Sequence, residues 1–524
     1  MKRNANIIIA LLGVVLGVLF TLTVLKFVGL NRKFDGDYNR WRKLNLILQE
    51  VQKNYVDTID MAKMTDAAVV AALAKLDPHS VYLPPVELEE SDSELAGNFE
   101  GIGITFNVPN DTAIVLNVIP GGPSEKAGLM AGDRIIKVDD RVIAGVKTPQ
   151  DSMVRLMKGP AGTKVKISVS REKQMIPFEI TRGKIPVHSV DAAFMVSDTV
   201  GYIKLTKFSR TTYKEFVEAS SKLIDQGMTS LVFDLRDNTG GYFDQALLLS
   251  NEFLQKGAAI VYMEGLHRPR QQYDADGRGK MKDISRTVLI DEGSASSSEI
   301  FAGAIQDNDR GVIVGRRSFG KGLVQEPINF TDGSGIRLTV ARFYTPSGRC
   351  IQKPYDENYN YDIFERYAHG EMTSADSMKV DSTALYYTVK GRRVYGGGGI
   401  IPDTFVPIDT TKASKFFINC NKKAVMMRFA SNFFDGNKTA LSRIDDFERL
   451  DRWMNEVGVE QQFLNYAAKV ENLKPAAGEW EKTKWYMMPQ VKALVGRYSK
   501  LQDEAFYRFY LPIDNEFQTA LTEQ

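Results

Sequence analysis

Short hydrophobic runs alternate with helical patterns through the middle of this chain. Runs rich in β-branched residues predict strands, and they lie at 200–205, 230–235, 258–263, 287–290 and 312–314. Segments 213–226 and 242–255 have apolar residues at helical spacing. Strands that alternate with helices predict an α/β fold with a mixed, mostly parallel sheet covered by helices.

The N-terminus carries an apolar run of a different kind. Residues 7–25 contain no charged side chain and are long enough to cross a bilayer as a helix. A signal peptide is the competing interpretation, but no Ala-x-Ala-like cleavage site follows the run. We therefore expect an uncleaved single-pass anchor in the inner membrane. The six residues before it are too few for a domain, so the catalytic part is expected in the periplasm or otherwise outside the cytoplasm.

Helical patterns flank the central region on both sides. Residues 38–95 are predicted to be mainly helical as far as the turn Leu76-Asp77-Pro78-His79-Ser80, and the acidic run 87–94 is interpreted as a solvated connector. Residues 353–393 form a polar insertion, and the chain from Lys412 onward is helical and aromatic-rich. Helical packing is the simplest use of those aromatic side chains. An oligomer interface or an adaptor-binding surface is an additional use.

Composition narrows the function classes. The 67 Lys and Arg residues against 65 Asp and Glu residues give a net charge of +2, which does not favour a nucleic-acid partner. The four histidines have no metal-ligand spacing, so no metal is expected. Cys350 and Cys420 leave one disulfide or two free thiols open.

Residues 99–173 combine short strands with glycine turns in a recognisable order. Gly101-Ile102-Gly103-Ile104 precedes a strand at 113–118, the elements Ala127-Gly128-Leu129 and 132–138, and a helix at 149–157. This series resembles a PDZ domain. The resemblance implies that the N–H groups of the Gly101–Ile104 loop bind the C-terminal carboxylate of a peptide that adds a strand to the sheet.

Polar residues gather where two of the central strands end. Asp237-Asn238-Thr239-Gly240-Gly241 follows one strand, and the serines at 294 and 296–298 follow another. Ligands of parallel sheets bind at the carboxyl ends of strands. Ser296 and Glu299 have the spacing of a capping box, which accounts for Ser296 structurally, but a hydroxyl at a helix N-terminus also suits a nucleophile.

Lys321 lies in a glycine-rich loop after the last central strand. The sequence Gly315 to Lys321 fits the GxxxxGK pattern of a phosphate-binding loop, but Gly322 stands where that motif has Ser or Thr. The following residues look extended, which leaves no helix to bind a phosphate. The other interpretation is a general base. It requires burial to lower the lysine pKa from ~10.4 to ~7, which costs roughly 4–5 kcal/mol.

Several motifs occur together in one order, and they resemble the carboxyl-terminal processing peptidases, or tail-specific proteases. The motifs are LDPHS, the PDZ-like region, DLRDNTGG, GSASSSEI, FGKG, YTPSGR and GGGGIIPD, and the resemblance covers about residues 40–410. The resemblance implies a crotonase/ClpP-like core, Ser296 as nucleophile, Lys321 as general base and Gln325 as the residue that orients the lysine. It also implies an oxyanion hole made by the N–H of Ser297 and that of Gly240 or Gly241.

One departure from the family pattern lies in the oxyanion loop, where Thr239 replaces a common proline. We expect five regions, namely an anchor at 1–30, a helical region at 31–98, a PDZ domain at 99–173, a protease core at 174–410 and a helical domain at 411–524. The expected function is a membrane-anchored Ser-Lys endopeptidase without cofactor that acts on proteins with free, unstructured C-termini. The alternative is a catalytically silent PDZ scaffold that tethers such tails. The family resemblance also implies that the PDZ domain gates access to the site.

Overall fold

The structure, a computed structural model, describes residues 36–108, 111–119, 121–355, 359, 361–409 and 411–523. The chain divides into two units, residues 1–75 and residues 76–524. The expected membrane segment at 7–25 lies outside the described residues. No helix in the described part is both long and apolar enough to span a membrane.

The first unit contributes two described helices, α2 (Gly36–Asn54) and α3 (Met61–Leu73). Asp60 caps α3, since its carboxylate accepts a hydrogen bond from the N–H of Lys63 at 3.2 Å. Leu44, Leu46 and Ile47 of α2 are exposed. The predicted helical character of this region is confirmed.

The second unit opens with β1 (Val81–Leu83) and helix α4 (Pro85–Leu95). Residues 87–94 lie within α4, in line with the helical prediction for 38–95, and the acidic side chains of Glu87, Glu89, Glu90 and Asp92 are exposed, as expected for a solvated run. Pro85 fits the first position of a helix because it has no N–H to leave unpaired, and Glu87 in the first turn complements the helix dipole.

The predicted PDZ region forms a six-stranded sheet with two short helices. The sheet order is β3-β4-β5-β7-β8, with β6 paired to β5, so β3 is an edge strand. Its core is apolar and includes Val115, Ile135, Ile167 and Met153. The elements are β3 (Ile104–Asn107), β4 (Ala113–Val118), α5 (Pro123–Ala127), β5 (Arg134–Val138), β6 (Arg141–Val142), α6 (Gln150–Met157), β7 (Lys164–Arg171) and β8 (Gln174–Thr181). Strands β2 (Asn98–Gly101) and β9 (Gly183–Pro186) pair where the chain enters and leaves this module.

The central sheet has six strands in the order β10-β11-β12-β15-β16-β21. Strand β10 is antiparallel to β11, and every other neighbouring pair is parallel. The strands are β10 (Val190–Met195), β11 (Val200–Leu205), β12 (Ser230–Asp234), β15 (Ser285–Ile290), β16 (Val312–Gly315) and β21 (Thr404–Phe405). The prediction of a mixed, mostly parallel sheet is confirmed.

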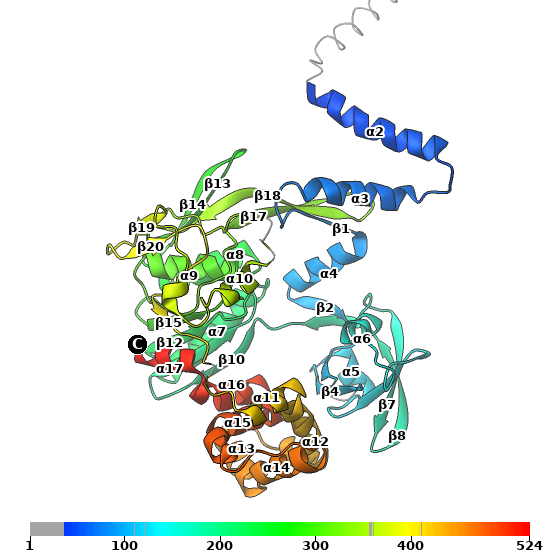
Figure 1. Ribbon diagram of the computed structural model, residues 1–524, viewed down its shortest axis with the longest axis vertical. Helices are drawn as coiled ribbons and strands as arrows, with labels where there is room; N and C mark the ends of the chain where they lie inside the picture. The colour runs from blue at the N-terminus through cyan, green and yellow to red at the C-terminus, as the bar shows by residue number, and fades with distance from the viewer. Residues whose placement is uncertain are drawn as a thin grey trace, which may run out of the picture. The chain divides into compact units, whose positions relative to one another are not determined.

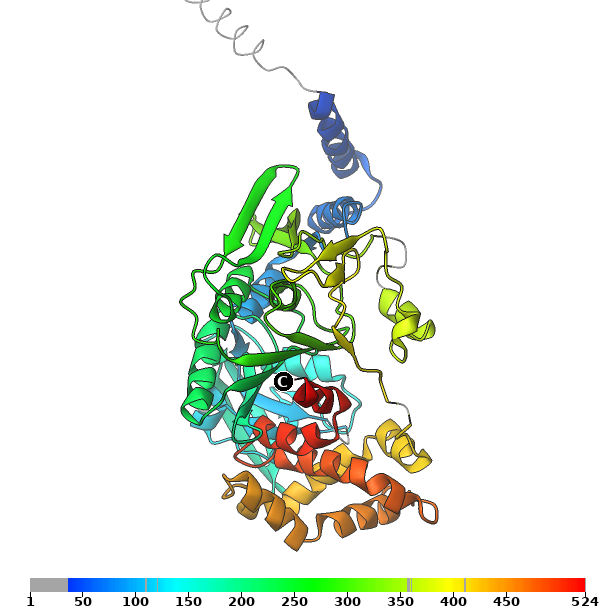
Figure 2. The same ribbon diagram turned by 90° about the vertical axis from the view of Figure 1, so that its left-hand side faces the viewer.

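Helices cover both faces of this sheet (Figures 1 and 2). Against one face pack α7 (Thr212–Asp225), α8 (Phe243–Phe253) and α9 (Ser297–Asp307), and their core centres on the rings of Phe216, Phe233, Phe253 and Phe301. On the other face Tyr202, Val232 and Leu289 contact a cluster with Phe517 and Leu511 of the C-terminal segment. The sheet is therefore buried on both faces, as its β-branched runs predict.

A second sheet lies beside the first in the order β1-β18-β13-β14, with β17 also paired to β18. Its remaining strands are β13 (Ala259–Gly265), β14 (Arg268–Asp274), β17 (Leu323–Asn329) and β18 (Gly335–Tyr344). The predicted insertion at 353–393 contains α10 (Asp362–Ala368), the 3-10 turn η1 (Ala375–Ser377), β19 (Leu385–Tyr387) and the first residue of β20 (Arg393–Tyr395).

The C-terminal region is helical as predicted, with α11 (Lys415–Lys422), α12 (Val425–Leu441), α13 (Phe447–Glu456), α14 (Val459–Lys469), α15 (Glu479–Gly496), α16 (Asp503–Tyr510), the 3-10 turn η2 (Leu511–Ile513) and α17 (Asn515–Thr522). Phe429, Phe433 and Trp480 are buried in one aromatic core. Trp485 is the exception, because its side chain is exposed.

Cys350 and Cys420 are free thiols. Of the two possibilities that the sequence leaves open, the structure therefore has two free thiols and not one disulfide.

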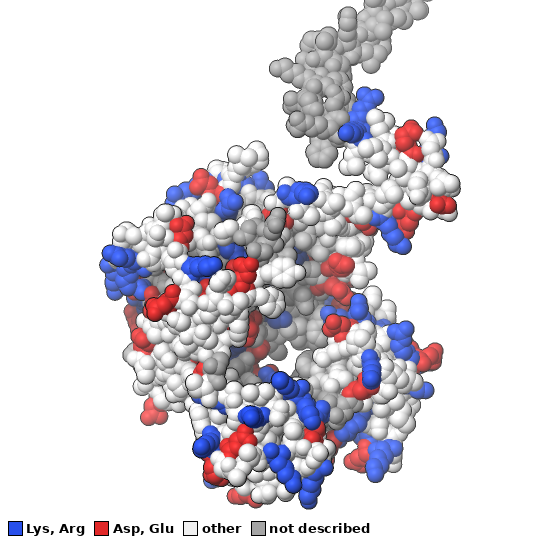
Figure 3. All heavy atoms as spheres, viewed as in Figure 1, with Lys and Arg blue, Asp and Glu red and all other residues white. Residues whose placement is uncertain are grey.

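Both signs of charge occur across the visible face of the molecule (Figure 3). This distribution matches the nearly balanced composition.

Candidate active site

Three loops meet at one edge of the central sheet. They follow β12, β15 and β16, which are parallel neighbours, so their carboxyl ends lie side by side. The loops carry Gly240, Ser296 and Lys321. The expectation that polar residues converge beyond the strand ends is confirmed.

Ser296 is the N-cap residue of α9 and has a left-handed backbone conformation with φ of 56°. This conformation is uncommon for a residue with a side chain. It is energetically unfavourable and persists only when contacts with the surrounding structure hold it in place. The pair with Glu299 has the arrangement of a capping box. The Ser296 N–H donates to the Glu299 carboxylate at 2.8 Å. In the other half of a capping box the Ser296 hydroxyl oxygen only accepts, from the Glu299 N–H, so the cap does not use the O–H of Ser296.

The neighbouring serines differ from Ser296 in burial and in hydrogen bonding. Ser294, Ser297 and Ser298 are at most 1% exposed, whereas Ser296 is half-buried. The hydroxyl of Ser298 donates to the Asn238 carbonyl at 2.8 Å, and that of Ser297 donates to the Gly241 carbonyl at 3.0 Å. These two serines hold the 238–242 loop against α9. Ser296 is thus the serine of the 296–298 run whose hydroxyl is left for chemistry.

Glu299 connects the serine loop to the lysine loop. Its fully buried carboxylate accepts hydrogen bonds from the N–H groups of Ser296, Gly320 and Lys321 at 2.8–2.9 Å and from the Ser318 hydroxyl at 2.5 Å. Burial raises the pKa of Glu299 to about 7, although these hydrogen bonds act in the opposite direction. One side chain thereby fixes the backbone on both sides of the cleft.

Lys321 is largely buried, and its amino group donates to the Gln325 side-chain oxygen at 3.0 Å. Burial lowers the pKa of Lys321 below its ordinary value, and the charge of Arg337 lowers it further, while Glu299 and Asp77 act in the opposite direction. Gln325 lies on β17, four residues after Lys321, and its side-chain NH₂ group donates to the backbone carbonyl of His79 at 2.5 Å. The lysine is therefore held by Gln325, which is held in turn by a backbone carbonyl.

The turn that supplies this carbonyl was not predicted to belong to the site. The Asp77 carboxylate accepts from the N–H groups of His79 and Ser80, both at 2.8 Å, and from the Ser80 hydroxyl at 2.6 Å. Thr339 of β18 also donates to Asp77 at 3.2 Å. The only sequence signal was the Asp-Pro-His-Ser turn itself, because a carbonyl leaves no mark in the side-chain pattern.

Ser296 and Lys321 face the same cavity, which has a volume of about 900 Å³. Both residues are described, and no hydrogen bond joins their side chains in this structure. The cavity is also lined by the predicted residues Gly240, Gly241, Ser297 and Gln325. The structure thus brings all six predicted catalytic and oxyanion residues to one cleft.

The two candidate glycines of the oxyanion hole differ in their hydrogen bonds. The N–H of Gly240 donates to the Asn238 side chain at 2.9 Å. Among the described residues, no partner accepts from the N–H of Gly241 or of Ser297. A Cβ at Gly240 would lie only 2.8 Å from the Ser297 nitrogen, so this glycine allows the loop to approach α9. The geometry favours Gly241 and Ser297 as the pair of donors.

The predicted peptide-binding loop lies between β2 and β3. Gly101 ends β2 beside the last turn of α6, where a Cβ would meet the Met157 carbonyl at 3.5 Å. Ile102 and Gly103 are buried, and Ile104 begins the edge strand β3. The loop therefore opens onto a strand edge beside a helix, as strand addition requires.

The nucleotide alternative for Lys321 has no structural basis. Strand β17 begins at Leu323, two residues after the lysine, so no helix N-terminus is present to bind a phosphate. Within the described residues, no cluster of three or more His, Cys, Asp or Glu side chains is arranged to hold a metal ion.

Comparison with known proteins finds two family matches. A family model of peptidase family S41 matches residues 199–360, and a PDZ-domain model matches residues 101–181. The carboxy-terminal processing protease CtpA of Bacillus subtilis is 32% identical over 359 residues, which cover 67% of this chain and 76% of that protein. A Staphylococcus haemolyticus protein named "Probable CtpA-like serine protease" is 32% identical over 67% of this chain and 71% of its own length.

Among solved structures, the photosystem II D1 C-terminal processing protease is 26% identical, with a TM-score of 0.38, and the match covers 69% of this chain and 86% of that one. The PDZ domain of a Vibrio cholerae carboxy-terminal protease, solved with a peptide, is 34% identical, with a TM-score of 0.16. That match covers 17% of this chain and 99% of the other.

The first prediction concerns the charge beside Lys321. If neutral Lys321 is the base, cleavage of an unfolded test protein rises with pH through the lysine pKa. Arg337→Met removes a positive charge that lowers this pKa, so the rising limb moves to higher pH. Arg342→Met, on the same strand β18 but not among the charges that act on Lys321, is the control. An unchanged limb in Arg337→Met would contradict this account.

The second prediction concerns Glu299. In Glu299→Gln, an NH₂ group replaces one acceptor, so at least one buried backbone N–H of Ser296, Gly320 or Lys321 loses its partner. We expect a loss of about 1–3 kcal/mol in the free energy of unfolding and a large fall in cleavage rate. Denaturant melts and a cleavage assay measure both. Glu326→Gln removes an exposed carboxylate that pairs with Arg268, and it should behave as the unmodified chain.

Proposed function

Since the chain belongs to peptidase family S41 and carries a PDZ domain, we propose that it is a C-terminal processing endopeptidase with Ser296 as nucleophile and Lys321 as general base. The observation that carries this proposal is the Glu299 carboxylate, which holds the backbone of both residues at one cleft. The hydrogen bonding of the adjacent serines supports Ser296 over Ser297 and Ser298.

In the proposed reaction, neutral Lys321 takes the proton of the Ser296 hydroxyl as its oxygen attacks the scissile carbonyl. The resulting oxyanion accepts hydrogen bonds from the N–H groups of Ser297 and Gly241. The Lys321 ammonium then donates its proton to the leaving amine, and an acyl-enzyme remains on Ser296. A water molecule then gives a proton to Lys321 and attacks the ester, and Lys321 returns the proton to the Ser296 oxygen as the acid product leaves.

The contacts of Lys321 suit this role. Burial and the Arg337 charge favour the neutral amine, which is the form a base requires. Gln325 holds the amine 3.0 Å from its side-chain oxygen. Since no hydrogen bond joins Lys321 and Ser296 here, we propose that this arrangement is a resting one and that bound substrate brings the two groups together.

The proposed substrate is the unstructured C-terminal tail of a protein. Its last residues would add a strand to the open edge of β3, and its terminal carboxylate would accept hydrogen bonds from the N–H groups of the Gly101–Ile104 loop. The proposal also retains the sequence-based expectation of a membrane anchor at residues 7–25, with the catalytic part outside the cytoplasm. No metal or organic cofactor takes part in the proposed reaction.

The third prediction tests the Ser-Lys dyad. Ser296→Ala and Lys321→Met should each abolish cleavage of an unfolded test protein and leave the thermal midpoint nearly unchanged, because neither side chain is needed for packing. Lys256→Met and Ser442→Ala change exposed residues and should keep full activity. Cleavage at the normal rate by Ser296→Ala or Lys321→Met would exclude this assignment. No cleavage by the unmodified chain would instead favour a PDZ scaffold.

The fourth prediction tests recognition of the tail. A labelled peptide with a free C-terminal carboxylate should bind the Ser296→Ala variant, and the same peptide with a C-terminal amide should bind about ten- to a hundredfold more weakly, because charge-assisted hydrogen bonds are lost. Fluorescence anisotropy measures both affinities. A peptide acetylated at its N-terminus is the matched control and should bind as the free peptide does. Equal affinity for acid and amide would count against carboxylate recognition.

A further inference from the structure

We propose that helix α17, at the C-terminal end of the described chain, is a positioning element of the active site and acts through Glu516. This inference rests on the proposed function. Residues 515–522 lie far along the sequence from the catalytic motifs, yet the helix packs against the central sheet beside β12, β15 and β16.

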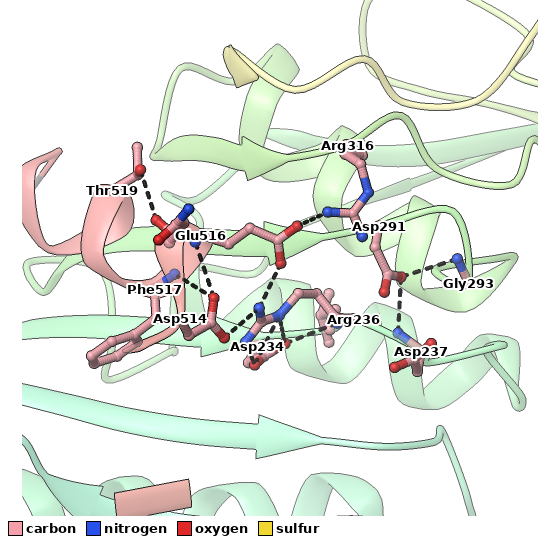
Figure 4. A network of polar contacts seen from close by, with 12 residues as sticks. Asp234, Arg236, Asp237, Asp291, Gly293, Arg316, Asp514, Glu516, Phe517 and Thr519 are labelled. Atoms are coloured by element: carbon pink, nitrogen blue, oxygen red, sulfur yellow. Dashed lines mark hydrogen bonds and ion pairs between the residues drawn. The ribbon is translucent and has the colours of Figure 1, made fainter. Parts of the chain in front are cut away.

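Glu516 is a buried carboxylate that bridges two arginines (Figure 4). It accepts a hydrogen bond from Arg236 at 2.5 Å and another from Arg316. The arginine side chains are only 13% and 11% exposed, and that of Glu516 is 9% exposed. The bridge is therefore shielded from water, where ion pairs are hardly screened by salt.

The first arginine stands at the entrance to the proposed oxyanion loop. Arg236 follows β12 and also pairs with Asp234 at 2.6 Å and with Asp514 at 2.7 Å. The next residue, Asp237, has a left-handed backbone with φ of 57°, and its N–H donates to the Asp291 carboxylate at 2.9 Å. A strained residue at this point needs fixed neighbours on both sides. Asp514, the N-cap residue of α17, and Glu516 hold the neighbour on the N-terminal side, Arg236.

The second arginine stands at the entrance to the lysine loop. Arg316 follows β16, five residues before Lys321, and it also pairs with Glu292 at 2.8 Å. Glu292 lies in the loop that leads to Ser296. Arg316 thus links Glu516 to both the serine loop and the lysine loop.

Glu516 therefore spans β15, the strand that leads to Ser296, and joins the strands on either side of it. Within the described residues, no other carboxylate pairs with both Arg236 and Arg316. Without Glu516, two buried guanidinium groups each lose a partner, and the ion-pair link between the end of β12 and the end of β16 is broken. A displacement of about 1 Å in a catalytic group can lower turnover by about a hundredfold.

A purely structural role predicts a different outcome. If the bridge only stabilised the fold, its loss would lower the thermal midpoint, while each folded molecule would keep its normal kcat. The test therefore measures kcat and KM separately for a peptide substrate, well below the thermal midpoint of every variant, with the folded fraction determined by circular dichroism.

The variants are Glu516→Gln, which removes the bridging charge, and Arg316→Lys, which keeps the charge but cannot reach both carboxylates in a planar fork. We expect kcat to fall about ten- to a hundredfold in each, with KM within about twofold of normal. The kcat of the double variant should be no lower than that of the less active single variant, because both changes break the same link. Glu523→Gln is the matched control, since Glu523 lies at the end of the same helix, is exposed, and accepts a hydrogen bond from Thr404 at 3.0 Å.

A normal kcat per folded molecule in Arg316→Lys would overturn the proposal, even if Glu516→Gln did not fold. So would a fall in kcat of equal size in Glu523→Gln. Failure of the proposed function gives a separate result, because then the unmodified chain would not hydrolyse the peptide at all.

Discussion

The geometry of the cleft depends on one buried carboxylate. Glu299 accepts four hydrogen bonds, and the donors come from the serine loop and the lysine loop, which follow different strands. A buried carboxylate is costly unless it is fully hydrogen-bonded, so each donor is held firmly in place. The helix that begins at Ser296 and the strand that begins after Lys321 therefore have a fixed relation. This constraint also explains how Ser296 can keep its unfavourable backbone conformation.

Elements farther from Glu299 also hold the serine loop and the lysine loop in place. The parallel order of β12, β15 and β16 brings three loops to one edge, and the phenylalanine core on one face sets the position of α9. The turn at Asp77 supplies a backbone carbonyl to Gln325, and Gln325 in turn holds Lys321. On the opposite face, the arginine network extends from the strand ends to α17. Apolar packing thus sets the layers, while buried polar contacts set the loops.

Much of this arrangement could be predicted from sequence, and the reasons for success and failure are physical. Strands such as 230–235 and 287–290 are buried on both faces, so their composition alone identifies them. Ser296, Lys321 and Gln325 carry distinctive side chains in ordered motifs. The choice between Gly240 and Gly241 depends on an amide of Asn238, and the His79 carbonyl and the Glu516 bridge depend on contacts between distant segments. Such contacts have no local sequence pattern.

The protonation states of Glu299 and Lys321, the two titrating groups of the cleft, depend on one another. Burial raises the pKa of Glu299 to about 7 and lowers that of Lys321, and the Glu299 charge raises the pKa of Lys321. Below pH 7 Glu299 gains its proton and stops favouring the ammonium, so the lysine loses its proton more readily. Above pH 7 the ionised Glu299 makes the same loss harder. The two protons are therefore coupled: protonation of Glu299 lowers the pKa of Lys321, and loss of the Lys321 proton raises the pKa of Glu299 by the same amount. The carboxylate that positions the base thus also influences how readily the base gives up its proton.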